Sequence, residues 1–252
     1  MPRVRLRKRA LGRVNAMLRP IGFEVVRPVD DFADYIPFER TQVGAKAAGL
    51  AVGEYIDREF NVPGSTQDTI DRMAALGVFD RPISRVCEIG PGSGRYLEKV
   101  LAACSPQAYE IYETATAWRE WLVATYPVTA HPADGRTLAA TADGSVDLVH
   151  SHKVLNGLKI LDACGYLAEI ARVTAPGGAV VFDVLTERAL DEVTLCRWHE
   201  SGAGYVTSMM SEQYAVDFFT RRGFTLLGDF LATSMPGKTH YLVFQLERAS
   251  SC

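Results

Sequence analysis

Three glycines at alternate positions follow a short apolar run and precede a helical pattern. They are Gly90, Gly92 and Gly94, within the stretch from Val86 to Leu97. Glycine permits backbone angles closed to other residues and removes the side chain that would keep a ligand off the main chain. A strand, a glycine turn and a helix start in this order are typical of a loop that binds a nucleotide-like cofactor.

The spacing of these glycines narrows the class of cofactor. A dinucleotide fingerprint has its third glycine three residues after the second, whereas Gly94 comes two residues after Gly92. A Walker A loop ends in Gly-Lys-Ser/Thr, whereas Gly94 is followed by Arg95 and Tyr96. NAD-linked oxidoreductases and P-loop ATPases therefore fit the loop poorly.

The pattern that does fit is acidic-x-Gly-x-Gly-x-Gly, which starts at Glu88 and includes Pro91. Through it the chain resembles the class I S-adenosylmethionine-dependent methyltransferases, over roughly residues 68 to 246. The resemblance implies a Rossmann-like α/β fold with a seven-stranded, mostly parallel sheet and helices on both faces. It also implies S-adenosyl-L-methionine as cofactor, S-adenosyl-L-homocysteine as product, and cofactor contacts from Glu88 and from Gly90, Pro91, Gly92 and Gly94.

Two acidic residues further along extend this expected cofactor site. Glu113 directly follows the run 108–112, about 20 residues past the loop. A carboxylate at this strand end can accept hydrogen bonds from both ribose hydroxyls. Asp134 and Gly135 follow the third expected strand. In the family an acidic residue here contacts the adenine amino group, and the next residue lies near the ring. Asp-Gly is also a common turn, so both interpretations of this pair stay open.

Two histidines follow the fourth expected strand, in the order His150, Ser151 and His152. Ligands of an open α/β sheet bind outside the carboxyl ends of the strands, which places this segment beside the transferred methyl group. A hydroxyl acceptor gains from a general base with a pKa near working pH, and histidine suits that demand. We expect His152, nearer the open end, as the base, His150 as the second choice, and Ser151 beside the cofactor. For either histidine, a hydrogen bond to the backbone at the strand end is the alternative.

The elements that must position these residues alternate along the chain. Strands are expected at 86–89, 108–112, 128–130, 146–149, 179–182, 224–227 and 241–246, with helical patterns between most of them and a turn at 176–178. This alternation predicts βαβ units and a parallel sheet. A helix is expected at about 68–76, weak helical spacing at 39–60 and less regular structure at 187–210. Residues 1–67 are expected to form a basic helix and a helical cap on the acceptor side, and residues 68–252 the cofactor-binding domain.

The length and composition favour one soluble domain with additional segments outside its core. The chain has 252 residues, 48% hydrophobic and 23% charged, which is ordinary for a globular protein. Five cysteines without a CxxC pair suggest neither a disulfide framework nor a zinc site, so we expect a cytoplasmic protein. Arg13 and Asn15 interrupt the apolar run that a signal peptide would need. No uncharged apolar stretch approaches the roughly 20 residues of a membrane-spanning helix.

The acceptor is expected to be a hydroxyl, most simply on a sugar or oligosaccharide. The chain lacks the Asn-Pro-Pro-Tyr motif with which relatives that methylate adenine or glutamine nitrogen follow the fourth strand, and two histidines there favour oxygen. The N-terminal segment is similar to those of bacterial enzymes that modify surface or polymeric sugars, the actinobacterial kind included. Asp30, Asp31, Asp34 and Asp183 could bond sugar hydroxyls or hold a divalent metal. Their spacing defines no metal site, and a solvated loop explains them as well.

The basic N-terminus leaves other partners open. Residues 1–27 carry eight Arg or Lys against one Glu, although the whole chain has a net charge of −3. A basic amphipathic helix over residues 3–19 could touch an anionic membrane, where a lipid acceptor would lie, or bind RNA. The acidity beyond residue 27 counts against a long nucleic-acid channel. The remaining alternatives are a natural product as acceptor and a non-catalytic partner protein that binds the cofactor. The chain could also form a homodimer, although no feature of the sequence requires one.

Overall fold

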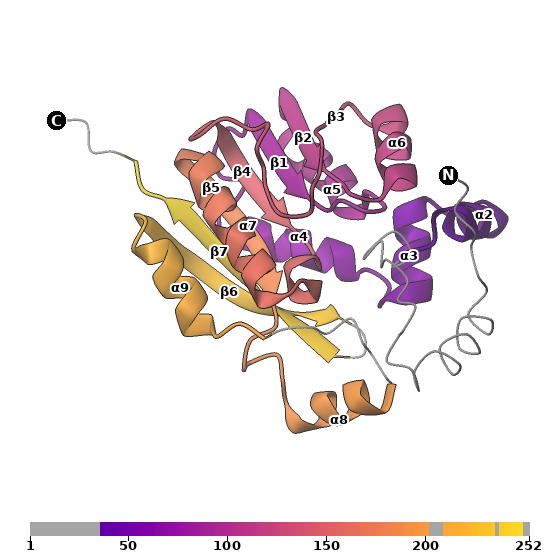
Figure 1. Ribbon diagram of the computed structural model, residues 1–252. Coiled ribbons are helices and arrows are strands. Elements are labelled where there is room, and N and C mark those ends of the chain that lie inside the picture. The colour runs from indigo at the N-terminus through magenta and orange to yellow at the C-terminus, as the bar shows by residue number, and fades with distance from the viewer. Residues whose placement is uncertain (1–35, 202–208, 235–236, 249–252) are drawn as a thin grey trace, which may run out of the picture. The chain divides into compact units, whose positions relative to one another are not determined.

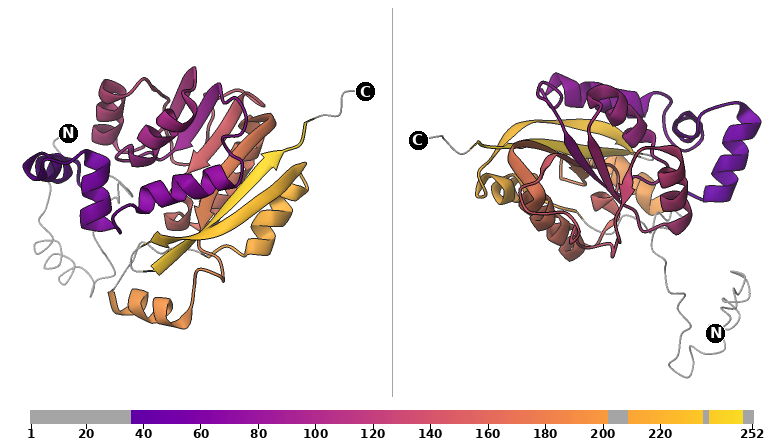
Figure 2. Two further views of the ribbon diagram at one scale, coloured as in Figure 1. Left: turned by 180° about the vertical axis from the view of Figure 1, so that it is seen from behind. Right: turned by 90° about the horizontal axis from the view of Figure 1, so that it is seen from above.

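The computed structural model describes residues 36–201, 209–234 and 237–248, which belong to one compact unit that begins at Ile36. Its centre is a seven-stranded sheet with helices on both faces (Figures 1 and 2). The strands are β1 (Arg85–Ile89), β2 (Ala108–Tyr112), β3 (Thr129–Ala130), β4 (Val146–Ser151), β5 (Thr174–Val184), β6 (Phe224–Ser234) and β7 (Gly237–Leu246). The helices are α2 (Phe38–Ala48), α3 (Val52–Phe60), α4 (Ser65–Ala75), α5 (Arg95–Cys104), α6 (Thr116–Thr125), η2 (Leu155–Gly157), α7 (Ile160–Val173), α8 (Glu192–Ser201) and α9 (Glu212–Thr220).

The strand order is β3-β2-β1-β4-β5-β7-β6. Strands β1 to β5 pair in parallel, and β7 runs antiparallel to both β5 and β6. The chain leaves β1 toward β2 and β3, and then returns to place β4 on the other side of β1. This reversal between β1 and β4 is the switch point at which open α/β sheets bind ligands. The expected α/β class and seven-stranded, mostly parallel sheet are confirmed.

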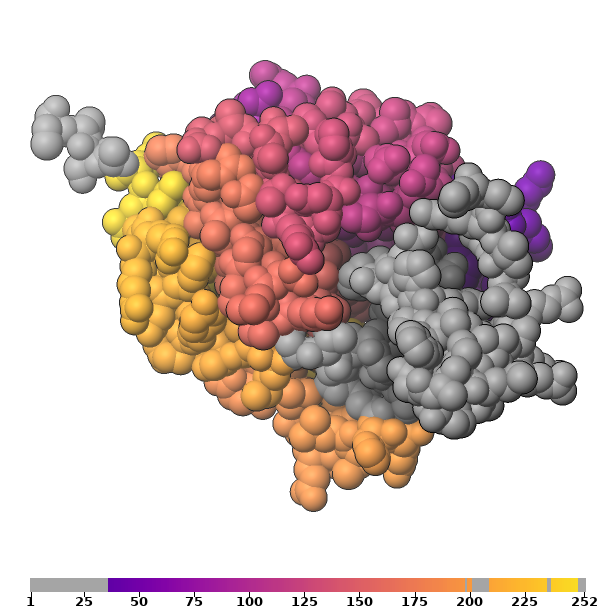
Figure 3. Space-filling view, viewed as in Figure 1, coloured from indigo at the N-terminus to yellow at the C-terminus, as the bar shows by residue number. Residues whose placement is uncertain are grey.

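Two apolar layers hold the sheet in place. On one face, α7 and α9 bury side chains such as Leu167 and Phe219 against Phe182 and Phe244 of the sheet. These two helices lie next to each other on the face seen in Figure 3. On the other face, α4 and α5 bury Met73, Leu97 and their neighbours against the sheet. Because both faces are covered, side chains from alternate positions of a central strand are all buried, and any polar group among them needs an internal partner.

Most expected elements are found, with four differences. The expected turn 176–178 lies inside β5 as an irregularity, because Val146 pairs with Thr174 while Leu148 pairs with Ala179. Strand β6 continues to Ser234, beyond the expected end at residue 227. The stretch 187–210, expected to be less regular, contains α8. The weak helical pattern 39–60 forms two helices, separated at Gly49, which has a φ of 65°. The expected basic helix, residues 23–27, Asp30, Asp31 and Asp34 lie outside the described residues.

The division expected at residue 67 stays a prediction about function. In space, α2 and α3 belong to the same compact unit as the sheet, since that unit starts at Ile36. None of the helices in the described part of the chain is both long and apolar enough to span a bilayer.

Candidate functional site

The glycine loop leaves β1 at its carboxyl end and turns into α5. Gly90, Gly92 and Gly94 have φ angles of 64°, 53° and 71°, a region that favours glycine. A Cβ on Gly90 would lie 2.5 Å from Val154 Cγ2, and a Cβ on Gly94 would lie 2.7 Å from Leu122 Cδ2. A Cβ on Gly92 would meet no atom within 4 Å. The outer two glycines are therefore required by packing, whereas the middle one leaves bare main chain facing open space.

Glu113 follows β2 and lies against this bare segment. Its Oε2 accepts a hydrogen bond from the Gly92 N–H at 2.7 Å, and its Oε1 accepts one from the Ala115 N–H at 2.7 Å. The side chain is buried, and burial raises the pKa of Glu113 while the backbone donors lower it. Each carboxylate oxygen keeps a second lone pair, so the group can still accept bonds from a diol. The structure thus brings together the loop and the carboxylate that the sequence assigned to one cofactor.

Asp134 and Gly135 form a tight turn near this carboxylate. The Asp134 carboxylate accepts bonds from the N–H groups of Arg136 and Thr137 at 2.8 and 2.7 Å, and from the Thr137 hydroxyl at 2.8 Å. Burial raises the pKa of Asp134, but these donors together outweigh it, so the pKa lies below its usual value. Gly135 has a φ of 75°, and its Cβ position lies 3.8 Å from Thr114. The pair is placed beside the segment that follows Glu113, and its contact with adenine stays a prediction.

The two histidines lie deeper than expected. Strand β4 extends through Ser151, so His150 and His152 share one side of it, with ring centroids 5.0 Å apart. His152 stacks on Tyr96 with 3.8 Å between ring centroids, and its Nδ1 lies 3.2 Å from the Tyr241 hydroxyl. Burial lowers the pKa of His150 to about 3 and holds the pKa of His152 well below its usual value. Both rings are therefore neutral, and His152 is only 6% exposed.

Ser151 points to the other side of β4, where its hydroxyl donates a 3.3 Å bond to the Ile89 carbonyl oxygen. The bond links the ends of β1 and β4 directly beneath the glycine loop. Ser151 is fully buried, so its hydroxyl supports the loop from inside. A contact between Ser151 and the cofactor stays a prediction.

Glu88, the acidic residue of the glycine pattern, lies in a buried ring of polar groups. The Tyr109 hydroxyl donates to Glu88 Oε2 at 2.7 Å and lies 2.8 Å from His150 Nε2. His150 Nδ1 lies 3.9 Å from Glu88 Oε1. In the arrangement in which Tyr109 donates to Glu88, His150 donates from Nε2 to the Tyr109 oxygen, and its Nδ1 faces Glu88. Burial raises the pKa of Glu88 to about 8, so this carboxyl is protonated at neutral pH and the group of polar side chains has no net charge. His150 Nδ1 has no hydrogen-bond partner among the described residues. Its expected contact with the cofactor stays a prediction.

This ring predicts how stability depends on pH. Because the pKa of Glu88 is raised on folding, the native state holds a proton that the unfolded chain loses above about pH 4.5. The free energy of unfolding should therefore fall as pH rises from about 4.5 through about 8. Glu88→Gln keeps an acceptor for Tyr109 and cannot ionise, and it should be more stable than wild type by roughly 4 kcal/mol at pH 8, because a difference of one pKa unit corresponds to about 1.4 kcal/mol.

Urea unfolding of wild type and Glu88→Gln between pH 4.5 and 9 measures this difference. Glu98→Gln, a change to an exposed residue of α5, serves as the control. Parallel stability curves for wild type and Glu88→Gln would show that Glu88 is ionised in the folded protein.

A second group of residues surrounds the tip of β4, and of these only Asp183 was singled out from the sequence. Asp183, at the end of β5, accepts bonds from Lys153 N–H, from Thr239 Oγ1 at 2.7 Å and from Asn156 Nδ2 at 3.0 Å. Asp183 is fully buried, and burial raises its pKa against these donors. Asp183, whose carboxylate was expected to bond a sugar hydroxyl, thus stabilises the turn that follows β4.

An ion pair connects α3 to the start of α5. Asp57 Oδ1 lies 2.7 Å from Arg95 Nη1, and both residues are 7% exposed. Asp57 also accepts bonds from the Thr66 N–H at 3.1 Å and the Thr66 hydroxyl at 2.7 Å, at the start of α4. Because Arg95 directly follows Gly94, this one carboxylate ties three helices to the cofactor loop.

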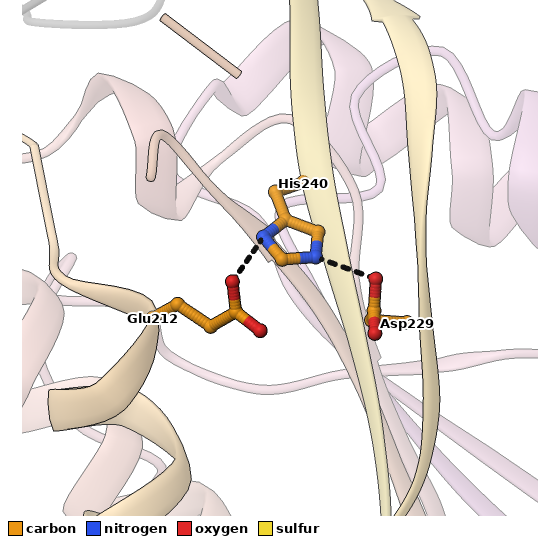
Figure 4. A group of neighbouring side chains, drawn as sticks. All are labelled: Glu212, Asp229 and His240. Atoms are coloured by element: carbon orange, nitrogen blue, oxygen red, sulfur yellow. Dashed lines mark hydrogen bonds and ion pairs between the residues drawn. The ribbon is translucent and has the colours of Figure 1, made fainter. Parts of the chain in front are cut away.

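A third polar cluster lies elsewhere, where Glu212, Asp229 and His240 approach one another (Figure 4). His240 Nε2 lies 3.0 Å from Asp229 Oδ1, and His240 Nδ1 lies 2.8 Å from Thr186 Oγ1. The residue types could hold a metal ion. However, Arg188 Nη1 already contacts Asp229 at 2.6 Å and Glu212 at 3.5 Å. The cluster is therefore an ion-paired network in which an arginine occupies the position of a cation.

The comparison with known proteins agrees with this geometry. The chain matches the family described as "Methyltransferase domain" over residues 58–228, and it belongs to that family. No curated protein matches the sequence. An O-methyltransferase family protein from Burkholderia thailandensis is similar in structure, with a TM-score of 0.58 and 19% identity. The match covers 84% of this chain and 63% of that protein, so the chain spans less than two thirds of its length.

Two further solved structures contain S-adenosylhomocysteine. Magnesium protoporphyrin IX methyltransferase from Synechocystis has a TM-score of 0.57 at 14% identity, covering 87% of this chain and 98% of that one. N-methyltransferase NodS from Bradyrhizobium japonicum has a TM-score of 0.55 at 15% identity, covering 83% and 97%. At these identities the likeness shows the fold. The family match confirms the expected methyltransferase domain, and the shared fold holds the product of the expected cofactor in both relatives.

Proposed function

We propose that the protein transfers a methyl group from S-adenosylmethionine to a hydroxyl of a sugar or oligosaccharide. The main support for S-adenosylmethionine as the cofactor is the contact between Gly92 and Glu113. A bare main-chain segment and a buried carboxylate meet at the switch point of the sheet, with the carboxylate 2.7 Å from the Gly92 nitrogen. A ribose whose diol bonds Glu113 would lie along this segment, as a nucleoside does in Rossmann-like folds.

The chemistry requires little covalent help from the protein. The bound cofactor supplies an electrophilic methyl group on a positively charged sulfur. The protein's part is to align the acceptor oxygen about 3–3.5 Å from that methyl carbon and to exclude competing water. Packing of Val154 against Gly90 joins the turn after β4 to the cofactor loop. We propose that this turn therefore positions the acceptor beside the methyl group.

Several features support oxygen as the acceptor atom. The Asn-Pro-Pro-Tyr motif is missing after β4, and the segment there is His150 to Asn156, rich in groups that bond or deprotonate hydroxyls. One similar solved structure is described as an O-methyltransferase family protein. His152 and His150 were the bases expected from sequence, and both are neutral, as a base must be. Both histidines are, however, buried, so an acceptor hydroxyl would have difficulty in reaching either ring.

We propose two roles for the N-terminal residues. We propose that residues 1–67 shape the acceptor side and that residues 3–19 contact an anionic membrane surface, because of their positive charge. Binding to anionic vesicles that weakens as salt is added would support the second proposal. Equal binding to neutral vesicles would contradict it.

Labelled methyl transfer tests the proposed function directly. Purified protein is mixed with radiolabelled S-adenosylmethionine and with carbohydrate, lipid or RNA fractions of bacterial cells. We expect label in the carbohydrate fraction, in a form that survives mild alkali, since ethers resist the treatment that hydrolyses methyl esters. Label only in RNA, or only in an alkali-labile form, would contradict sugar O-methylation. No label in any fraction, together with tight binding of the product, would indicate a non-catalytic protein.

A further inference from the structure

The turn that follows β4 holds a lysine in a backbone conformation that lysine rarely adopts. Lys153 has a φ of 59°, and among the described residues Ser105 is the one other non-glycine residue with a positive φ. Such residues cost of order 1–3 kcal/mol and persist where the surroundings fix them. Here Asp183 fixes the turn by accepting the Lys153 N–H, and Val154 packs on Gly90 of the cofactor loop. The strained position therefore lies next to the site proposed for methyl transfer.

The contacts of the Lys153 side chain leave one position on its nitrogen open. Nζ donates to the Thr233 carbonyl oxygen at 2.7 Å and to Asn61 Oδ1 at 3.1 Å. Both partners are neutral oxygens that only accept. They take the two hydrogens that a neutral amine has, so the remaining tetrahedral position holds its lone pair, or the third hydrogen of the ammonium form. Among the described residues, no carboxylate lies within ion-pair distance of Nζ, and none holds the ammonium form by direct contact.

The charged groups around Lys153 are already engaged with one another. Arg95 pairs with Asp57, and Asp183 receives bonds from Thr239, from Asn156 and from the Lys153 backbone. His152, the preceding residue, is neutral. Burial and the nearby Arg95 charge lower the pKa of Lys153 to about 8, against the opposing charges of Asp183 and Asp57. A large fraction of Lys153 is therefore in the neutral amine form at mildly alkaline pH, and a general base has to be in this form.

We infer that Lys153, rather than either histidine, accepts the proton of the acceptor hydroxyl during methyl transfer. The inference rests on the proposed function and assigns its base. In the step, an oxygen lone pair forms the new bond to the methyl carbon while the carbon–sulfur bond breaks and its electron pair returns to sulfur. The hydroxyl proton moves to the open position on Nζ. The products are S-adenosylhomocysteine, a methyl ether and a lysine ammonium, which later releases its proton to water.

His150 Nδ1 and His152 Nε2 also have no hydrogen-bond partner among the described residues, but both rings are buried, whereas Lys153 is partly exposed. The His152 ring is stacked against Tyr96, and its Nδ1 contacts Tyr241, so it lies between two aromatic side chains. His150 is fully buried in the ring with Glu88 and Tyr109. Lys153 is partly exposed at the tip of the strand. We assign to His152 the role of supporting the turn from below, as a positioning residue.

Two variants of Lys153 and one of a neighbouring lysine test the inference. Lys153→Arg keeps a cation and donors for Thr233 and Asn61, but arginine does not deprotonate at working pH. Lys153→Met removes the nitrogen altogether. Lys159→Met, an exposed lysine a few residues on, is the matched control. For each protein, methyl transfer into the carbohydrate fraction is measured from pH 6 to 9, and the affinity for S-adenosylhomocysteine is measured by calorimetry.

We expect Lys153→Arg to bind S-adenosylhomocysteine within about twofold of wild type and to lose about 100-fold or more in transfer rate. The wild-type rate should rise with pH with its midpoint near pH 8, where half of Lys153 is in the amine form, and this rise should be absent in Lys153→Arg. Lys153→Met should show the same loss, and Lys159→Met should behave as wild type. In parallel, NMR of protein labelled at lysine Cε should show one signal that titrates near pH 8 and is missing in Lys153→Arg.

Three results would overturn the inference in distinguishable ways. Equal transfer by wild type and Lys153→Arg at every pH would remove Lys153 from the mechanism while the proposed function stands. A loss of affinity for S-adenosylhomocysteine as large as the loss of rate would make Lys153 a cofactor contact. If wild type transfers no methyl group to any fraction, the proposed function itself fails, and the base assignment fails with it.

Discussion

Replacing Gly92 with alanine should lower the affinity for S-adenosylhomocysteine by about 100-fold, which is about 2.7 kcal/mol. The added methyl group meets no protein atom within 4 Å, so it should point into the space where the cofactor lies. It would hold the ligand off the main chain beside Glu113. The protein should remain folded, because the strain of alanine at a φ of 53° costs only about 1–2 kcal/mol.

Gly144→Ala is a close control for this change. Gly144 has a φ of 58°, and a Cβ there also meets nothing within 4 Å, but it lies in an exposed turn before β4. Both variants should lose a similar amount of stability in urea unfolding. Only Gly92→Ala should lose affinity in calorimetry. If both variants bind the product as wild type does, the ligand does not lie along Gly92.

Asp57→Ala should lower the free energy of unfolding by about 3–5 kcal/mol. The substitution leaves the Arg95 guanidinium buried without its partner and removes the acceptor for Thr66 at the start of α4. Because Arg95 adjoins Gly94, the cofactor loop should lose order as well. Thermal and urea unfolding, with and without S-adenosylhomocysteine, would measure both effects.

Two variants separate the buried ion pair from ordinary surface charge. Asp57→Leu combined with Arg95→Met replaces the pair by apolar groups and should recover most of the lost stability. Glu59→Ala breaks an exposed pair, in which Arg58 Nε lies 2.9 Å from Glu59 Oε1, and should change stability by less than about 0.5 kcal/mol. A loss for Asp57→Ala no larger than for Glu59→Ala would show that Arg95 reaches solvent.

The cofactor loop and the positions of most strands along the chain could be predicted from sequence because glycine turns and apolar runs have few alternative structures. Gly90, Gly92 and Gly94 are found where a strand turns into a helix, and all three have positive φ. Glu113 lies against the loop because parallel strands β1 and β2 end at the same edge of the sheet. Such placements follow from the fold alone.

The side on which a strand residue lies could not be predicted in the same way. A parallel sheet covered on both faces has apolar residues at all positions, so alternation does not show which face a polar residue occupies. Glu88 and His150 are neighbours across β1 and β4, and both lie inside the α4 and α5 layer. The sequence places them near a strand end, but their ring with Tyr109 depends on the register of three strands.

Lys153 could not be recognised from sequence for a different reason. Its importance depends on a positive φ and on contacts with Asn61 and Thr233, which are 92 and 80 residues away in the chain. No local pattern indicates either feature. Likewise β6 was expected to end at residue 227, yet the strand continues past a register shift between Leu226 and Gly228.

Calorimetric titration of the wild-type protein with S-adenosylhomocysteine shows whether the glycine loop and Glu113 bind the cofactor. We expect binding to one site per chain with a Kd below about 1 mM, and a loss of at least about tenfold in affinity for Glu113→Gln, whose side chain replaces one acceptor oxygen by a donor. NADH should give no heat. If the folded protein shows no heat with S-adenosylhomocysteine at millimolar concentration, the loop and Glu113 do not form a cofactor site, whatever the acceptor proves to be.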